Sequence, residues 1–238
     1  METDTPQQNL LLASLSGEVQ ERLFSRMKGV ELPQGKVIFE PGDTVRHVYF
    51  PTDSIIATLC LTESGASAET SIVGNEGVVG LALFMGGGSM PSQAVVQNSG
   101  HAYRLPGQHF MDECNRHGEL LQLILRYTQA LITQTSLHAV CNRHHRIEQQ
   151  LCRWLLVSLD RLPGNELEIT QELIANMLGV RREGITVAAC KLQQKGVIEY
   201  CRGHISVLDR LKLEQLSCEC YAVVKKETDR LLPQTSDV

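Results

Sequence analysis

Apolar residues near the start of the chain recur every three or four positions. The repeat runs through Leu12, Leu15, Val19, Leu23 and Met27. This spacing places them on one face of a helix and predicts a helical segment over residues 9–30. Ser16 is a suitable helix start, because a serine side chain can accept a hydrogen bond from a free N–H of the first turn.

After residue 32 the pattern changes to short apolar runs separated by turn residues. Six runs rich in β-branched or aromatic residues are Lys36–Phe39, Val45–Phe50, Ile55–Leu61, Ala68–Val73, Gln93–Gln97 and His101–Arg104. Breaks such as Pro33-Gln34-Gly35 and Pro41-Gly42-Asp43 space them at roughly 8–12 residues. We therefore expect an antiparallel sandwich or jelly roll, a β-roll, as a first domain over residues 1–117.

A long helix is predicted next, because residues 119–141 contain no glycine or proline. At 1.5 Å per residue it spans roughly 35 Å, and it is apolar on two sides. We expect one side to pack on its own domain and the other on a second copy of the chain. The residues assigned to the dimer interface are Leu120, Ile124, Tyr127, Leu131 and His138. The neighbouring face carries Leu121, Leu125, Thr128, Ile132 and Ala139. The alternative is a single core helix without a dimer.

A basic joint, residues 142–146, follows this helix, and a second amphipathic helix runs to Leu162 before Pro163 and Gly164. Residues 118–143 are thus a dimerisation helix and hinge, and residues 144–238 form a third domain.

Within the third domain, residues 169–208 predict two helices and a hairpin. The first helix has Thr170 as N-cap, and Gly179 can take the left-handed conformation of a sharp exit. A longer helix, residues 181–195, precedes two alternating runs, residues 197–200 and 204–208. Together they describe a winged helix-turn-helix, so the fold class is α+β.

The start of the second helix carries side chains that can read base pairs. Arg182 can pair with guanine, Glu183 can accept from the cytosine amino group, and Thr186 can contact either. Backbone contacts are expected from Arg181, Thr170, Gln171, Arg202 and His204. The alternative to DNA contact is that these residues are only the solvated, charged start of a helix in an ordinary helical domain.

The amino-acid composition says less about fold and function than the pattern of apolar and polar residues does. The 238 residues are 42% hydrophobic and 21% charged, as in globular proteins, which excludes disorder and collagen-like repeats. Residues 1–141 carry a net charge of -6 and residues 142–205 one of +2. This asymmetry directs attention to the second segment, and chance is the alternative explanation of so small a positive charge. The start of the chain lacks the basic residues of a signal peptide and no run spans a bilayer, so we expect a soluble, cytoplasmic protein without membrane contact.

The order of these elements resembles the Crp/Fnr (catabolite-activator) superfamily of bacterial transcription regulators. The helix-turn-helix carries the most specific match, and the residues that supply it are Thr170, Ile174, Ala175, Leu178, Gly179, Arg182, Glu183 and Ile185. The β-roll matches more loosely, through Gly35, Ile38, Pro41-Gly42-Asp43, Gly77 and Gly80. The resemblance implies a homodimer that binds a palindromic operator in duplex DNA, with RNA polymerase as a further partner.

Two departures from the family pattern change what is expected. Val187 stands where relatives that read the best-known operator have a second arginine, so the bound sequence should differ. In the sensor, Leu81 follows Gly80, and Pro91-Ser92 occupies the place of the phosphate-binding Arg-Ser pair, so cyclic AMP should not bind in the usual mode. The effector pocket is assigned to Val79, Gly80, Leu81, Pro91, Ser92, Gln93 and Arg126.

No cofactor or metal is predicted. The first cysteine is Cys60, so the N-terminal ligands of an iron–sulfur branch are missing. Cys218-Glu219-Cys220 is the only close cysteine pair, and no further ligands are evident near it. Haem would need one of His47, His101, His109 or His138 as a ligand. Residues 35–105 contain no His-x-His pair of a jelly-roll metalloenzyme, so an enzyme is not expected.

The sequence therefore predicts a homodimeric, sequence-specific DNA-binding transcription regulator with an effector-sensing β-roll. The alternative from another class is a small-molecule-binding or signalling adaptor whose winged helix contacts proteins. Salt-dependent binding to duplex DNA separates the two.

Overall fold

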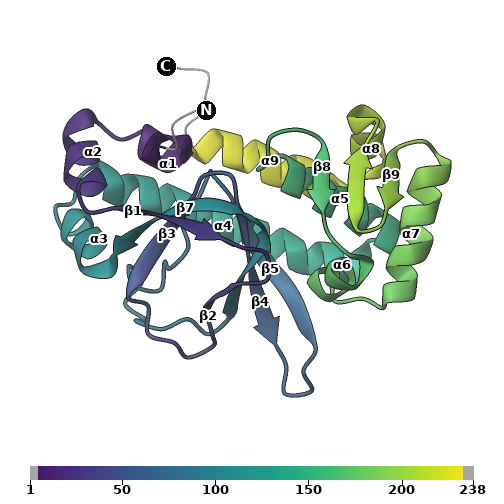
Figure 1. Ribbon diagram of the computed structural model, residues 1–238, viewed down its shortest axis with the longest axis horizontal. Helices are drawn as coiled ribbons and strands as arrows, with labels where there is room; N and C mark the ends of the chain where they lie inside the picture. The colour runs from purple at the N-terminus through teal and green to yellow at the C-terminus, as the bar shows by residue number, and fades with distance from the viewer. Residues whose placement is uncertain (1–4, 233–238) are drawn as a thin grey trace.

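The structure is a computed structural model, in which residues 5–232 are described (Figure 1). The outermost parts of the first and third predicted domains, residues 1–4 and 233–238, lie outside the described residues. The strands of the N-terminal half are β1 (Lys28–Leu32), β2 (Val37–Phe39), β3 (His47–Pro51), β4 (Ile55–Leu61), β5 (Ser67–Val73), β6 (Gln93–Asn98) and β7 (Gly100–Pro106). They form two antiparallel sheets, of order β1-β7-β3 and β2-β6-β4-β5, which make up the predicted β-roll.

One of these sheets is buried on both faces. In β4, Ile56 points into the core of the β-roll, whereas its neighbours Ile55 and Ala57 belong to a second core on the outer face. Alternation along the strand produces this division, because successive side chains point to opposite faces of a sheet. The outer core also contains the helices of the C-terminal half.

The predicted helix over residues 9–30 is wrong in its extent. The structure has short helices η1 (Pro6–Gln8), α1 (Leu10–Ala13) and α2 (Gly17–Phe24), and the chain then enters β1. Residues of β1 pair with β7, for example Gly29 with Tyr103. Pairing with a strand some seventy residues away overrides the local helical spacing that Met27 continues.

After the β-roll come α3 (Gly107–Cys114) and the long α4 (Glu119–His144). Gly77 allows α4 to approach the β-roll, because a Cβ atom there would lie 2.4 Å from the Tyr127 hydroxyl oxygen. None of the helices in residues 5–232 combines the length and apolar character that a membrane span requires.

The structure corrects the dimer face that the sequence predicts for α4. Leu120, Ile124, Tyr127 and His138 are buried within the single chain, and Leu131 is partly buried against the same core. A side chain that is already enclosed by its own domain has no surface to offer a partner. The neighbouring face is the free one: Leu125 is 48% exposed and Ile132 is 53% exposed.

The C-terminal half contains α5 (Ile147–Leu159), β8 (Glu166–Glu168), α6 (Gln171–Leu178), α7 (Arg182–Gln194), β9 (Ile198–Cys201), β10 (His204–Val207), α8 (Arg210–Leu216) and α9 (Glu219–Leu231). The sheet order is β8-β10-β9, all antiparallel. The sequence did not predict β8, which adds a third strand to the wing.

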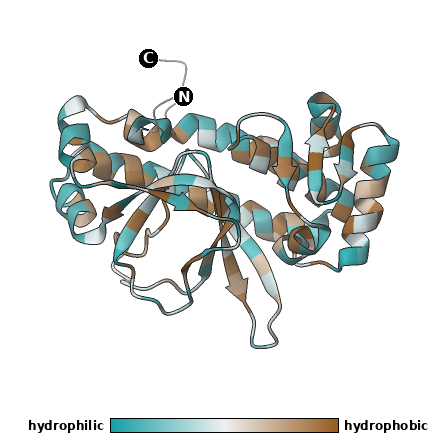
Figure 2. Ribbon diagram, in the orientation of Figure 1, coloured by the Kyte–Doolittle hydropathy of each residue, from teal (hydrophilic) through white to brown (hydrophobic). Residues whose placement is uncertain are grey.

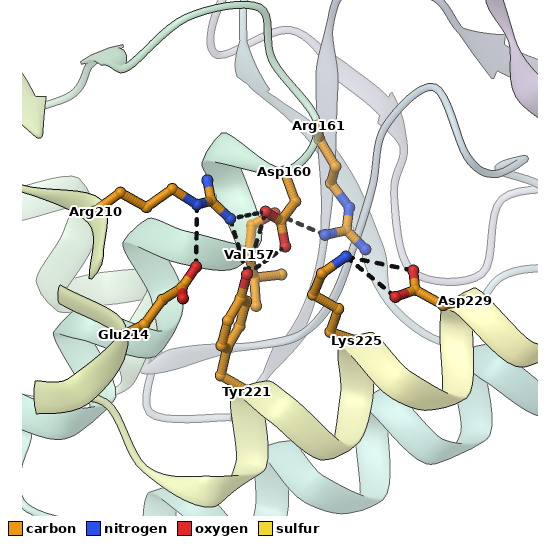
Figure 3. A network of polar contacts seen from close by, with 8 residues as sticks. All are labelled: Val157, Asp160, Arg161, Arg210, Glu214, Tyr221, Lys225 and Asp229. Atoms are coloured by element: carbon orange, nitrogen blue, oxygen red, sulfur yellow. Dashed lines mark hydrogen bonds and ion pairs between the residues drawn. The ribbon is translucent and has the colours of Figure 1, made fainter. Parts of the chain in front are cut away.

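The last helix, α9, runs back along α4 towards the β-roll (Figure 1). Near its start, the Tyr221 hydroxyl donates to Asp160 at 3.1 Å, and Arg210 forms an ion pair with the same carboxylate (Figure 3). Near its end, Leu231 and Leu232 join the core of the β-roll. The α9 helix therefore contacts both halves of the chain.

A buried polar cluster joins the sheet to α4 and α5. The Trp154 indole N–H donates to a Glu69 carboxylate oxygen at 3.1 Å, and an Arg153 N–H donates to His138 Nε2 at 2.8 Å. His138 Nε2 also lies 3.6 Å from the second Glu69 oxygen. Burial raises the pKa of Glu69 to about 7, and burial, with Arg153 beside it, lowers the pKa of His138 to about 3.

The Glu69→Gln variant should gain stability over the wild type as pH rises. The folded chain holds the Glu69 proton up to a pKa of about 7, whereas the unfolded chain releases it near 4.5. Raising the pH across this window therefore costs the folded wild type up to about 3 kcal/mol, a cost that glutamine avoids while still accepting from Trp154. Urea unfolding at several pH values measures the difference. Glu63→Gln, on the exposed tip of the same hairpin, should show no such trend, and a pH-independent difference for Glu69→Gln would contradict the assignment.

Candidate nucleic-acid interface and effector pocket

The helix-turn-helix has the local geometry that its sequence predicts. Thr170 caps α6, its hydroxyl oxygen accepting from the Leu173 N–H at 3.2 Å. Gly179 ends α6 with a φ of +64°, a left-handed conformation that favours glycine. The close approach of α7 to α5 depends on Gly184, because a Cβ atom there would lie 2.8 Å from Ile147 Cδ1.

The first turn of α7 projects polar side chains into solvent. Arg181, Arg182 and Glu183 are all exposed, and Figure 2 shows the start of α7 as hydrophilic. Arg182 Nη1 lies 3.6 Å from a Glu172 carboxylate oxygen, with both side chains about two-thirds exposed. A pair this exposed contributes little to stability, so Arg182 is free to exchange it for another partner. Val187, one turn on, is 55% exposed.

A shallow hollow brings together the start of α6, the start of α7 and the wing. Its lining is Thr170, Gln171, Arg182, Tyr200, Arg202 and Gly203. Arg202 takes a φ of +49° in the turn between β9 and β10, and His204 is exposed at the first position of β10. Several side chains predicted to contact DNA are therefore neighbours on one surface, although they come from three elements.

Thr186 is engaged within the protein. Its hydroxyl donates to the Gln171 side-chain oxygen at 2.6 Å and also lies 3.2 Å from the Arg182 carbonyl oxygen. A base contact by Thr186 stays a prediction, and it would have to replace the bond to Gln171.

A cavity of about 380 Å³ lies between the β-roll and α4. Its walls are mostly apolar, and its polar groups are hydroxyls. The lining residues with hydroxyls are Thr58, Ser71, Ser92, Thr128, Thr135 and Ser136. None of the described residues that line it is charged. The cavity suits an uncharged or weakly polar molecule, because a desolvated anion would lack a cation.

Most of the predicted pocket residues line this cavity. Val79, Gly80, Leu81, Pro91 and Ser92 all do so. Two others do not: the Gln93 side chain donates to Glu40 at 3.0 Å, and Arg126 is exposed on α4.

The sequence missed the contribution of α4 to the cavity, from Thr128, Leu131, Ile132, Thr135 and Ser136. The hydroxyl-bearing positions 128 and 135 are two helical turns apart, and this spacing is a signal of a shared polar face that the sequence analysis did not use.

The expectation that no further ligands lie near Cys218 and Cys220 is wrong. Cys141 and His145 lie beside them, and the ligand atoms of all four residues are within 4.8 Å of one another. The reason is that α9 folds back against the end of α4, a contact between distant segments that no local sequence pattern predicts.

Comparison with known families agrees with both halves of this architecture. Residues 29–117 match the model of a cyclic nucleotide-binding domain, and residues 149–216 match that of a Crp-like helix-turn-helix domain. The chain belongs to the Crp/Fnr superfamily. It is a Crp-family transcription regulator that combines a cyclic-nucleotide-binding-like domain with a helix-turn-helix. None of the curated protein sequences compared with it matches.

Solved Crp-family structures share the fold of this regulator. FixK2 from Bradyrhizobium japonicum is 14% identical, with a TM-score of 0.68 over 81% of this chain and 98% of FixK2. A CRP-family transcriptional regulator from Thermus thermophilus is 16% identical, with a TM-score of 0.64 over 79% of this chain and 96% of that one. The c-di-GMP responsive global regulator CLP from Xanthomonas campestris is 15% identical, with a TM-score of 0.63 over 81% of this chain and 99% of CLP. At these identities the likeness concerns the fold.

Proposed function

We propose that this Crp/Fnr protein is a homodimeric regulator that binds specific duplex DNA and acts in the cytoplasm without catalysing a reaction. The observation that carries the proposal is the exposed first turn of α7, where Arg182 and Glu183 face solvent. Arg182 lines the same hollow as the wing residue Arg202, and its ion pair with Glu172 is solvent-exposed and weak. An arginine and a glutamate at the N-terminal end of a recognition helix can read a guanine and a cytosine in the major groove.

The surrounding residues have the chemistry of backbone contacts. Arg181, Arg202 and His204 offer donors to phosphates, and Thr170 and Gln171 lie at the start of α6, where backbone N–H groups and the helix dipole also favour an anion. Val187 adds only an apolar contact, such as one to a thymine methyl group. We therefore expect an operator that differs from that of relatives with arginine at this position.

Dimerisation is proposed through the exposed face of α4. Leu125 and Ile132 are seven residues apart, and Ala139 continues the same row; all three are exposed in the single chain. Two copies packed along this face would present two recognition helices, which match a palindromic operator if they lie about 34 Å apart. RNA polymerase is the expected partner of such a regulator on DNA.

The effector is proposed to be a small, largely apolar molecule rather than a cyclic nucleotide. The cavity lining supplies hydroxyls but no cation, and it includes Leu131 and Thr135 of α4. A molecule in the cavity would therefore contact the same helix that carries the proposed dimer face. Such contacts could favour one arrangement of the two copies, and hence one spacing of the recognition helices.

Replacing Arg182 should weaken binding to the preferred operator and relax specificity at one base pair. Arg182→Ala is expected to lose about 1–3 kcal/mol per half-site on the preferred sequence and much less on sequences with that base changed. Operators selected from random duplexes, followed by titration at fixed salt, give the measurement. Lys226→Ala removes the same charge from the exposed side of α9 and should leave the operator preference intact. An equal loss on every sequence would make Arg182 a phosphate contact, and no salt-dependent binding to any duplex would refute DNA binding.

A charge on the exposed face of α4 should separate the dimer. Leu125→Glu would place a carboxylate without a partner in an apolar seam, weakening association by about 100-fold. Sedimentation equilibrium of the wild type should give the mass of two chains and that of the variant one. Leu211→Glu alters an exposed leucine on α8 and should remain dimeric. If Leu125→Glu also remains dimeric, the interface lies elsewhere.

Cyclic AMP should neither bind nor switch the protein. Its phosphate would enter a cavity whose described lining holds no cation, at a penalty of about 3 kcal/mol or roughly 100-fold in affinity. Calorimetric titration at physiological nucleotide concentration should detect no binding, and DNA affinity should not change. Micromolar binding that raises DNA affinity would show that a cation from outside this lining, such as Arg126 of a second copy, completes the site.

A further inference from the structure

Four side chains that commonly bind metals converge where α4 ends and α9 begins. Cys141 lies in the last turn of α4 and His145 is its C-cap residue, while Cys218 is the N-cap of α9 and Cys220 lies in its first turn. Each pair comes from one side of the joint, and the two sides are more than seventy residues apart in sequence. The four ligand atoms lie within 4.8 Å of one another.

The separations agree with a tetrahedral zinc site. Zinc bonds of about 2.3 Å to sulfur and 2.0–2.1 Å to nitrogen place two sulfurs about 3.8 Å apart, and a sulfur and a nitrogen about 3.6 Å apart. The structure has Cys141 Sγ 3.5 Å from Cys218 Sγ, and Cys220 Sγ 3.7 Å from His145 Nδ1. A disulfide would require the two sulfurs to approach to about 2.05 Å.

The ring of His145 is held in the orientation that a ligand needs. Its Nδ1 atom faces Cys220, while Nε2 lies 3.2 Å from a Glu219 carboxylate oxygen. A carboxylate that accepts from the outer nitrogen leaves the inner one unprotonated, which is the usual support of a metal-bound histidine. The Gln150 side chain donates to the His145 carbonyl oxygen at 2.8 Å and fixes the backbone of the joint.

Packing in an apolar core does not explain why residues 141, 218 and 220 are all cysteines. Cys114 and Cys152 are buried within the two large apolar cores, as expected of small hydrophobic residues. Cys141, Cys218 and Cys220 instead form a separate cluster that only Leu137 joins among the partly buried hydrophobic residues of the described chain. Three thiols with so little apolar surface around them contribute little as a hydrophobic core. Together with His145 they supply the four ligands of a metal site.

We propose that Cys141, His145, Cys218 and Cys220 bind a structural zinc ion. Three thiols release their protons to solvent as the thiolates and the neutral imidazole bond to Zn²⁺, without oxidation or reduction. Four protein ligands close the coordination sphere and leave no position for a substrate, so the ion has a structural role. It links the start of α9 to the end of α4, at the joint that leads into α5 and the helix-turn-helix.

Metal analysis of the full-length chain tests the proposal. Protein expressed with zinc and purified under reducing conditions should contain one zinc ion per chain, and Cys141→Ser and Cys220→Ser should retain only background zinc. Cys60→Ser, which alters an exposed cysteine of β4, is the matched control and should keep the full content. Replacement by Co²⁺ should give the absorption bands of a tetrahedral cobalt thiolate in the wild type and in Cys60→Ser, and not in the other two variants.

If the variants fold poorly, measurements on the wild-type protein alone still test the proposal. Removing the metal with a chelator should lower the midpoint of thermal unfolding, and adding Zn²⁺, but not Mg²⁺, should restore it. A reduced, folded wild type without zinc would overturn the proposal, as would a Cys141–Cys218 disulfide in the folded protein or equal zinc loss from Cys60→Ser. These results do not depend on DNA binding, so they stand apart from the test of the proposed function.

Discussion

The rest of the structure depends on the packing of α5 against the outer face of the β4–β5 sheet. Ile55 and Ala57 of β4 meet Trp154 and its neighbours in one core, while Ile56 of the same strand supports the interior of the β-roll. The sheet is thus shared by both halves of the chain. Glu69 lies within this contact, where its side chain accepts from the Trp154 N–H, and the cost of burying the charged carboxylate is partly offset by that bond and by the nearby Arg153. The position of α5 then sets that of α7 through the close contact at Gly184.

Different faces of the α4 helix contribute to the core of the β-roll, to the wall of the cavity and to the proposed dimer interface. One face closes the core of the β-roll, with Tyr127 against Gly77. The adjoining residues Leu131 and Thr135 form a wall of the cavity, and the outer row begins at Leu125. Because a helix is stiff along its length, a ligand that moves Leu131 also moves the outer row. The proposed sensing and the proposed assembly are therefore coupled through one element rather than through a chain of loops.

Patterns within a few residues of sequence predict the caps of α6 and most strands of the β-roll, whereas contacts between distant segments decide much of the rest. The caps of α6 were predictable because the Thr170 hydroxyl accepts from an N–H only three residues away and Gly179 adopts a left-handed conformation of its own backbone. The strands of the β-roll were found for a similar reason, since turn residues mark their ends. In contrast, α4 is apolar on two sides, and nothing in its periodicity tells which side its own domain covers. The strand β1 and the grouping of Cys141 with Cys218 depend on pairings between distant segments, which no local pattern encodes.

The course of α9 limits how the helix-turn-helix can move relative to the β-roll. Its start is fixed to α5 through Tyr221 and Asp160, and its end lies in the core of the β-roll through Leu231 and Leu232. A wide swing about residues 145–146 would stretch this connection or withdraw leucines whose burial is worth about 2 kcal/mol each. It would also separate α5 from the sheet that it covers. The contacts of α9 therefore oppose a wide swing between the two halves of one chain, which leaves the exposed row of α4 as a place for a ligand to act. In the proposed dimer, small displacements there would change the angle between the two copies, and with it the distance between their recognition helices.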